Sequence, residues 1–174
     1  ANSYDYSIYT QKFNADGSKN GDATQLEATN RTDYYDTEPQ ITALGNDGVY
    51  VVTWRGWDSI ANSNEYSIYT QKFNADGSKD GAATLIEATN RTNGIDQEPQ
   101  ITALGDNGEY VVTWSGQDSA ANSYDYSIYI QKFNADGSKN GELMQLEAID
   151  RTNLVDQDPQ ITALGKDGAF AVTW

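Results

Sequence analysis

The sequence contains neither cysteine nor histidine. The lack of cysteine excludes disulfides and thiolate metal sites, and the lack of histidine excludes His-ligated zinc and catalysis by Ser–His or Cys–His pairs. The chain also has no stretch of about 18 consecutive apolar residues, the length that a membrane-spanning helix needs. We therefore expect no membrane span and no enzyme of those classes.

Basic residues are scarce as well. The chain has 11 Lys and Arg against 26 Asp and Glu, which gives a formal net charge of −15. Such a charge repels the phosphates of nucleic acids and the headgroups of anionic lipids, and it favours cations. We expect no nucleic-acid partner.

The dominant positive feature is a 60-residue unit that occurs nearly three times. The copies are residues 1–60, 61–120 and 121–174; the first two agree at 44 of 60 positions, and the first and third at 39 of 54. Repeat units usually cannot bury their apolar faces alone and must stack. We therefore expect one repeat domain, residues 1–174, in which any site occurs several times.

Each copy reads as β-structure. No segment has a helical period, and the first copy offers four strand-like runs at residues 5–13, 23–29, 39–44 and 49–54. The segments 14–21 and 45–48 contain Asp-Gly, Asn-Gly and Gly-Asn steps, which are typical of hairpin turns. The sequence predicts an all-β chain of three four-stranded antiparallel repeats.

Both faces of these strands carry bulky side chains. Ile8 alternates with Tyr9 in the first run, and Val51 alternates with Val52 and Trp54 in the fourth. A sheet exposed on one face would alternate apolar with polar residues instead. This pattern favours a β-propeller, in which each blade is packed between two others. A β-trefoil and a β-prism are the alternatives, although their repeats are usually shorter.

The order of the runs sets the phase of the blades. If residues 39–54 form an inner pair, they join residues 66–89 of the next copy, and residues 99–114 join residues 126–149. An outer pair at the start and an inner pair at the end are then half-blades with open edges. Three blades are too few to close a propeller, so we expect a homodimer that completes a six-bladed ring, or a chain that is part of a longer array.

The string PQITALGNDGVYVVTW, followed by YSIYTQKFNADGSKDG, resembles repeats of very large secreted bacterial proteins of the RTX-adhesin type. The resemblance covers all three copies and implies an extracellular adhesive or spacer region. The same order also resembles the blades of sialidase-like propellers. However, residues 14–21 lack the Thr-Trp ending of the sialidase Asp-box, and no arginine cluster is evident, so sialidase activity is not implied.

Long loops on a rigid scaffold often carry binding residues. The longer connections, residues 30–38 and 55–63, therefore predict a ligand-binding rim for glycans or cell-surface ligands. Its members are acids, arginines and aromatic residues of the three copies: Arg31, Tyr34, Tyr35, Asp36, Trp54, Trp57, Arg91, Asp96, Trp114, Arg151 and Asp156.

Each of these residues also has a structural interpretation. Large aromatic residues are mostly buried, so core packing is the favoured role of Trp54 and Trp114. A loop-stapling ion pair is the favoured role of Arg31 and Asp36. Trp57 lies outside the repeat pattern, with Gln117 in its place in the second copy, and is the better candidate for an exposed aromatic contact.

A second candidate is a calcium site. Asn14, Asp16, Ser18 and Asn20 place oxygen-bearing side chains at alternate positions, as at the start of an EF-hand loop. Position twelve of such a loop should be a bidentate Glu, but it is Gln25 here. An ordinary hairpin turn is the favoured interpretation, because Asn, Asp, Gly and Ser are also the usual turn formers.

Catalysis has the weakest support. Asp36 and Glu38 could share one face of an extended segment, but nothing else distinguishes them from the other acids. Nearly identical copies indicate multivalent binding rather than one asymmetric active site. We expect a non-enzymatic, secreted carbohydrate-binding or adhesion module without a cofactor other than the candidate calcium. The alternative is a structural, self-assembling repeat or spacer.

Overall fold

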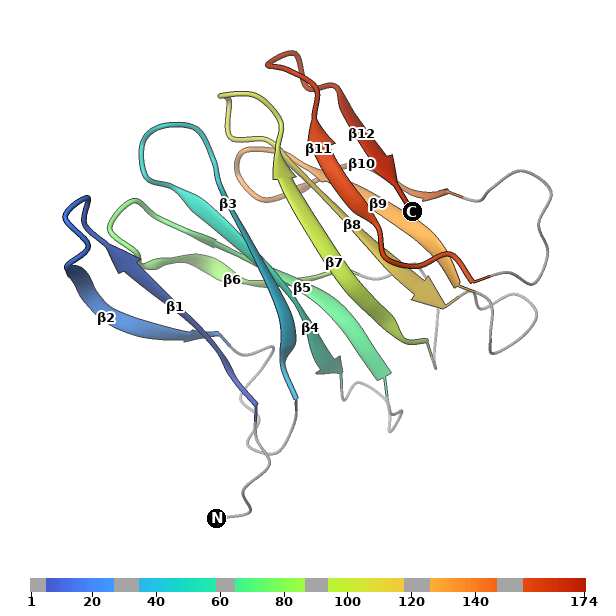
Figure 1. Ribbon diagram of the computed structural model, residues 1–174, viewed down its shortest axis with the longest axis horizontal. Helices are drawn as coiled ribbons and strands as arrows, with labels where there is room; N and C mark the ends of the chain where they lie inside the picture. Colours follow the sequence, from blue (N-terminus) through green and yellow to red (C-terminus); the bar gives the residue numbers. More distant parts are fainter. Residues whose placement is uncertain (1–5, 27–34, 59–64, 87–93, 118–125, 147–154) are drawn as a thin grey trace.

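The computed structural model of the 174-residue chain describes residues 6–26, 35–58, 65–86, 94–117, 126–146 and 155–174 (Figure 1). These residues form β-strands and turns, without a helix. The first six strands are β1 Ile8–Phe13, β2 Lys19–Leu26, β3 Thr37–Ala43, β4 Tyr50–Asp58, β5 Glu65–Phe73 and β6 Lys79–Ile86. The others are β7 Asp96–Ala103, β8 Tyr110–Gln117, β9 Tyr126–Phe133, β10 Lys139–Leu146, β11 Gln160–Ala163 and β12 Phe170–Thr173.

The strands form four antiparallel sheets, which we number in chain order. Sheet I is β1–β2, sheet II is β3–β4–β5–β6, sheet III is β7–β8–β9–β10 and sheet IV is β11–β12. The sheets lie side by side in a row, with sheets I and IV at opposite ends and the hairpin turns along one edge (Figure 1). Strand β7 packs against sheet II, and β11 packs against β7.

The predicted phase of the strands is confirmed. Sheet II joins the second half of one repeat to the first half of the next, and β4 pairs with β5 from Tyr50 opposite Phe73 to Asp58 opposite Glu65. Sheet III repeats this arrangement with β8 and β9. Each repeat contributes four strands, as predicted, and the described residues group them into two four-stranded sheets flanked by two two-stranded sheets, which correspond to the incomplete units predicted at the two ends.

The hairpin between β1 and β2 is shorter than predicted. The sequence predicts a loop over residues 14–21, but Lys19, Asn20 and Gly21 belong to strand β2. The turn itself closes at Gly17, whose N–H donates to the Asn14 carbonyl at 2.9 Å. Gly21 has a φ of 78° and lies beside the register shift between Thr10 and Lys12, so this glycine marks a bulge rather than a turn.

One apolar cluster fills each joint between neighbouring sheets. Ile8 and Leu26 pack with aromatic residues of sheet II, and Leu44 and Val51 pack against sheet III. The third cluster joins sheets III and IV. Each complete sheet therefore buries both faces, as the two-sided apolar pattern of the sequence predicts.

Candidate functional site

The predicted long-loop rim is described in part. Arg31, Tyr34, Arg91 and Arg151 lie outside the described residues. Of the remaining aromatic candidates, Tyr35 is exposed and its ring lies 5.1 Å from that of Tyr6. The two residues also form a parallel bridge, and the N–H of Asp36 donates to the Tyr6 carbonyl at 2.8 Å. This contact ties the start of β3 to the segment before β1.

The acidic candidates lie at or shortly before the first strand of a sheet. A Cβ added to Gly56 would lie 2.7 Å from Asp36 Oδ1, so the glycine leaves room for this carboxylate between the strand and Tyr69. Asp96 is buried in the equivalent position opposite Gly116. The N–H of Asp156 donates to the Tyr126 carbonyl at 2.9 Å, as Asp36 does to Tyr6. The three aspartates thus share a structural position at the end of a sheet.

Trp57 belongs to a cluster at the end of β4. Its ring meets that of Tyr66 edge-on at 4.9 Å, and the Arg55 guanidinium lies 3.9 Å from the centre of the Tyr66 ring. Arg55 also forms an ion pair with Glu38 at 3.2 Å. Trp57 is partly exposed, so its position fits an aromatic contact at the rim.

Trp54 and Trp114 are completely buried. Each indole stacks on a cross-strand tyrosine, Tyr69 for Trp54 and Tyr129 for Trp114, with ring centres 5.8 and 5.9 Å apart. No face of either ring is open to a ligand, which agrees with the core-packing interpretation of these two residues.

The candidate calcium loop is an internally bonded turn. Asp16 Oδ1 accepts hydrogen bonds from the hydroxyl of Ser18 at 2.6 Å and from its N–H at 2.9 Å, and these bonds lower the pKa of the Asp16 carboxyl. The Asn14 amide donates to the same hydroxyl. Asn20 lies in β2 opposite Lys12, outside the turn. The described residues contain no group of three or more acids placed to hold a metal ion.

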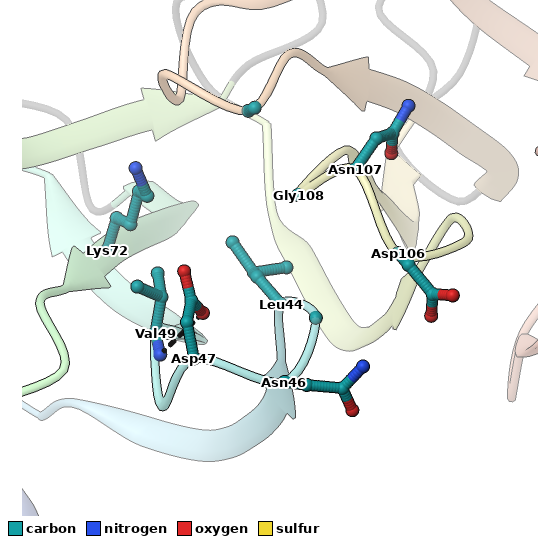
Figure 2. Close-up of a pocket in the computed structure, with 10 residues that line it drawn as sticks. Leu44, Asn46, Asp47, Val49, Lys72, Asp106, Asn107 and Gly108 are labelled. Carbon is teal, nitrogen blue, oxygen red and sulfur yellow. Dashed lines mark hydrogen bonds between the residues drawn. The ribbon is translucent and has the colours of Figure 1, made fainter.

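A further site lies on the opposite edge, among the hairpin turns. A groove of about 580 Å³ lies between the hairpin turns of sheets II and III (Figure 2). Asp47 and Lys72 line it from sheet II, Asp106 and Asn107 line it from sheet III, and Leu44 and Val49 supply apolar surface. Asp106 also forms an ion pair with Lys166 of the next hairpin turn.

A second groove, of about 330 Å³, lies between sheets I and II. It contains Lys12, which has the same repeat position as Lys72. A groove therefore lies at each of these two joints between sheets.

Sequence reasoning overlooked these grooves because it assigned binding to the longer connections. One available signal was the variation of positions 46 and 47, which are Asn-Asp, Asp-Asn and Lys-Asp in the three copies. Turn chemistry alone does not require these changes, since each dipeptide precedes the same glycine.

No helix among the described residues is long and apolar enough to cross a membrane. Comparison of the chain with protein-family models, with curated proteins and with solved structures gives no match.

Proposed function

We propose that this chain is a non-enzymatic, multivalent carbohydrate-binding or adhesion module of a secreted protein, built from propeller-type blades. The observation that carries the proposal is the groove at the joint between sheets II and III, with a smaller groove at the joint between sheets I and II whose lining shares only the lysine position with it. A volume of about 580 Å³ lies within the range of small-ligand sites. The RTX-adhesin resemblance supports secretion and adhesion.

The lining of the larger groove suits sugars. Asp47 Oδ1 accepts a 3.3 Å hydrogen bond from the Val49 N–H, and the carboxylate has further lone pairs for sugar hydroxyls. The Asn107 amide is bonded to Glu109 through both Nδ2 and Oδ1, which leaves one N–H as a donor. Val49 is partly exposed and offers apolar surface to the C–H face of a pyranose, whereas Leu44 is only 3% exposed.

Lys166 is paired with Asp106, and Lys72 is paired with Asp80 at 3.0 Å, so both lysines already have a carboxylate partner. The groove therefore suits neutral sugars, and the net charge of −15 disfavours anionic ones.

The carboxylates considered for catalysis have structural partners. Asp36 lies against Gly56, and both oxygens of Glu38 are engaged, one by Arg55 at 3.2 Å and one by the N–H of Glu98 at 2.6 Å. These contacts give Glu38 a structural role at the joint, which supports binding without catalysis.

A glycan array of immobilised neutral and acidic sugars tests this proposal, read with the chain and with three variants. We expect Asp47→Ala and Asn107→Ala to lose most of the signal, and Trp57→Ala, at the opposite edge, to keep it. Thermal melting of each variant checks that the fold is intact. Absence of binding to every sugar, or loss of binding in Trp57→Ala alone, contradicts the groove as a sugar site.

The second candidate function is a self-assembling structural repeat. The exposed strand edges of sheets I and IV favour it, because an open apolar edge is a template for pairing with another strand. Binding and assembly do not exclude each other, since the grooves and the strand edges are different surfaces.

A further inference from the structure

The repeats provide an internal control for the exposure of each apolar side chain. Phe13 of sheet I is 59% exposed, whereas its equivalents Phe73 and Phe133 are fully buried. Trp174, which follows β12, is 47% exposed, whereas Trp54 and Trp114 are fully buried. The same side chains therefore lie in a core where the sheet has four strands and face solvent where it has two.

The missing neighbours are visible in the complete sheets. Trp54 stacks on Tyr69 across the β4–β5 pair, and Trp114 stacks on Tyr129 across β8–β9. Tyr50 and Tyr110 stack in the same way on Phe73 and Phe133, with ring centres 4.8 and 4.7 Å apart. The remaining equivalents are divided between the two end sheets. Phe170 and Trp174 lie at β12 in sheet IV, whereas Tyr9 and Phe13 lie on β1 in sheet I.

We propose that a second copy of this chain completes both end sheets, so that β12 of each copy pairs with β1 of the other. The β4–β5 register transfers directly to the new pair. It places Phe170 opposite Phe13 and Thr173 opposite Thr10, and it stacks Trp174 on Tyr9, which is 60% exposed in the single chain. The resulting sheets have four strands, like sheets II and III.

The faces of the completed sheets match as well. Leu44 packs in one cluster with Ile101 of the following sheet, and Leu104 packs with Ile161 in the same way. The equivalent pair is Leu164 and the second copy's Ile41, and each of these two side chains is 62% exposed in the single chain. An apolar contact of the same kind as those at the internal joints is thus available at the new joint.

Polar contacts repeat across the joints in the same order. The N–H of Glu98 donates to the Glu38 carboxylate, and the N–H of Asp158 donates to the Glu98 carboxylate at 2.8 Å. The next bond in this series would join the Glu38 N–H of one copy to the Asp158 carboxylate of the other copy. These two groups lie at the new joint. Their residues have φ values of 57° and 56°, so the backbone already has the conformation found at the internal joint.

Lysines extend this polar pattern. Lys12 of sheet I donates to the Ala75 carbonyl in the hairpin turn of sheet II. Hydrogen bonds from Ser78 are the main cause of the lowered pKa of Asp76, and the charge of Lys12 adds to this effect; Ser138 and Lys72 act in the same way on Asp136. Lys132 is the third lysine of the set, and the second copy's Asp16 is the equivalent carboxylate for it.

Two copies of the chain are enough to close the row of sheets into a ring. The end sheets lie at opposite ends of one chain (Figure 1), so they do not meet each other. Each copy supplies two complete sheets and two halves, so two copies form six sheets in total. Closed propellers typically have about four to eight blades, a range that contains the six sheets of two copies.

Disulfide cross-linking tests the register, since the native chain has no cysteine to interfere. In the variant Thr10→Cys with Thr173→Cys, the two cysteines of different copies lie directly opposite, where Cα atoms about 4.5–5.5 Å apart permit a disulfide. Gln11→Cys with Thr173→Cys is the matched control, because its cysteines point to opposite faces of the sheet. We expect a covalent dimer on a non-reducing gel after mild oxidation, formed by the first variant only.

Light scattering on the unmodified chain gives the assembled mass. We expect twice the chain mass of 19.1 kDa, or about 38 kDa. Trp174→Ala should weaken the dimer by about tenfold or more, because a buried aromatic anchor is lost, whereas Trp57→Ala should leave it unchanged. A 19 kDa monomer, a larger open polymer, or equal cross-linking of the control variant would overturn the proposal.

Closure also has a consequence for the grooves, which rests on the proposed function. The equivalent groove at the new joint has Lys166 and Asp167 on one wall and the second copy's Asn46 and Asp47 on the other. Sugar binding at that joint then requires the dimer. The cross-linking result is independent of sugar binding, so failure of one proposal is distinguishable from failure of the other.

Discussion

The backbone N–H of Glu98 donates a 2.6 Å hydrogen bond to the carboxylate of Glu38, which links the first strand of sheet III to the first strand of sheet II. The other oxygen of that carboxylate accepts from Arg55. Both glutamates have a φ of 57°, in the left-handed region that side chains other than glycine seldom adopt. The bulge before Gln100 and this unusual backbone conformation together point the Glu98 N–H toward sheet II.

Removal of the Glu38 carboxylate should destabilise the fold. In Glu38→Ala, the Glu98 N–H loses a charged acceptor and Arg55 loses its ion-pair partner, so we expect a loss of about 1–3 kcal/mol in the free energy of unfolding. Urea denaturation measures this loss, with Asp22→Ala on the exposed strand β2 as the control. An equal effect of the two substitutions would contradict a linking role for Glu38.

A glycine at position 38 should be tolerated better than alanine. Both substitutions remove the carboxylate, but glycine adopts a φ of 57° without the Cβ penalty. We expect Glu38→Gly to be more stable than Glu38→Ala by about 1 kcal/mol in the same urea experiment. The reverse order would show that the backbone at this position relaxes in the alanine variant.

The phase of the sheets could be predicted from the sequence because a 60-residue repeat leaves few choices. Once VYVVTW is an inner strand, the next aromatic run, YSIYTQKF, is its neighbour, and the pairing of Trp54 with Tyr69 follows from that order. The burial of the tryptophans could be anticipated as well, since a two-sided apolar strand has no face for water.

The grooves and the bulges could not be predicted in the same way. The groove depends on how far apart two hairpin turns lie, and a repeat pattern within one chain does not contain that spacing. The left-handed φ of Glu38 could not be predicted either, because a glutamate before proline normally indicates an extended backbone. Here the hydrogen bonds of the Glu38 carboxylate overcome that local preference.

The buried tryptophans should tolerate loss of the indole N–H. The Nε1 atom of Trp114 has no hydrogen-bond partner among the described residues, although the ring is fully buried. Trp114→Phe removes this unpaired donor, so part of the cost of the smaller ring is offset, and we expect a loss of about 1–2 kcal/mol against about 3–5 kcal/mol for Trp114→Ala. Thermal and urea melting measure both, and losses of similar size would contradict this interpretation.

Alkaline pH should destabilise the chain through Tyr110. Burial raises the pKa of its hydroxyl from 10.0 to about 12. The unfolded chain therefore loses this proton at a lower pH than the folded chain does. The resulting stability is present below pH 10 and is lost as the pH rises to about 12, by roughly 2–3 kcal/mol in total.

Tyr110→Phe tests this alkaline loss. The substitution introduces the residue that the third repeat has at the equivalent position, Phe170, and it keeps an aromatic ring to stack on Phe133. We expect the variant to lose less stability than the native chain between pH 10 and 12, measured by urea denaturation at each pH. Tyr6→Phe changes a ring that is 57% exposed and is the control; if it flattens the profile equally, Tyr110 is not the cause.

Calcium should leave the melting temperature unchanged. In all three repeats, the first Asp of the hairpin turn accepts two hydrogen bonds from one serine: Asp16 from Ser18, Asp76 from Ser78 and Asp136 from Ser138. A calcium ion would compete with these donors, and the nearby residues supply no bidentate Glu to compensate. We therefore expect identical midpoints in excess calcium and in EDTA. If calcium instead raises the midpoint, and Asp16→Asn with Asp76→Asn and Asp136→Asn abolishes the rise, the turns are metal sites and their hydrogen bonds to serine rearrange on binding.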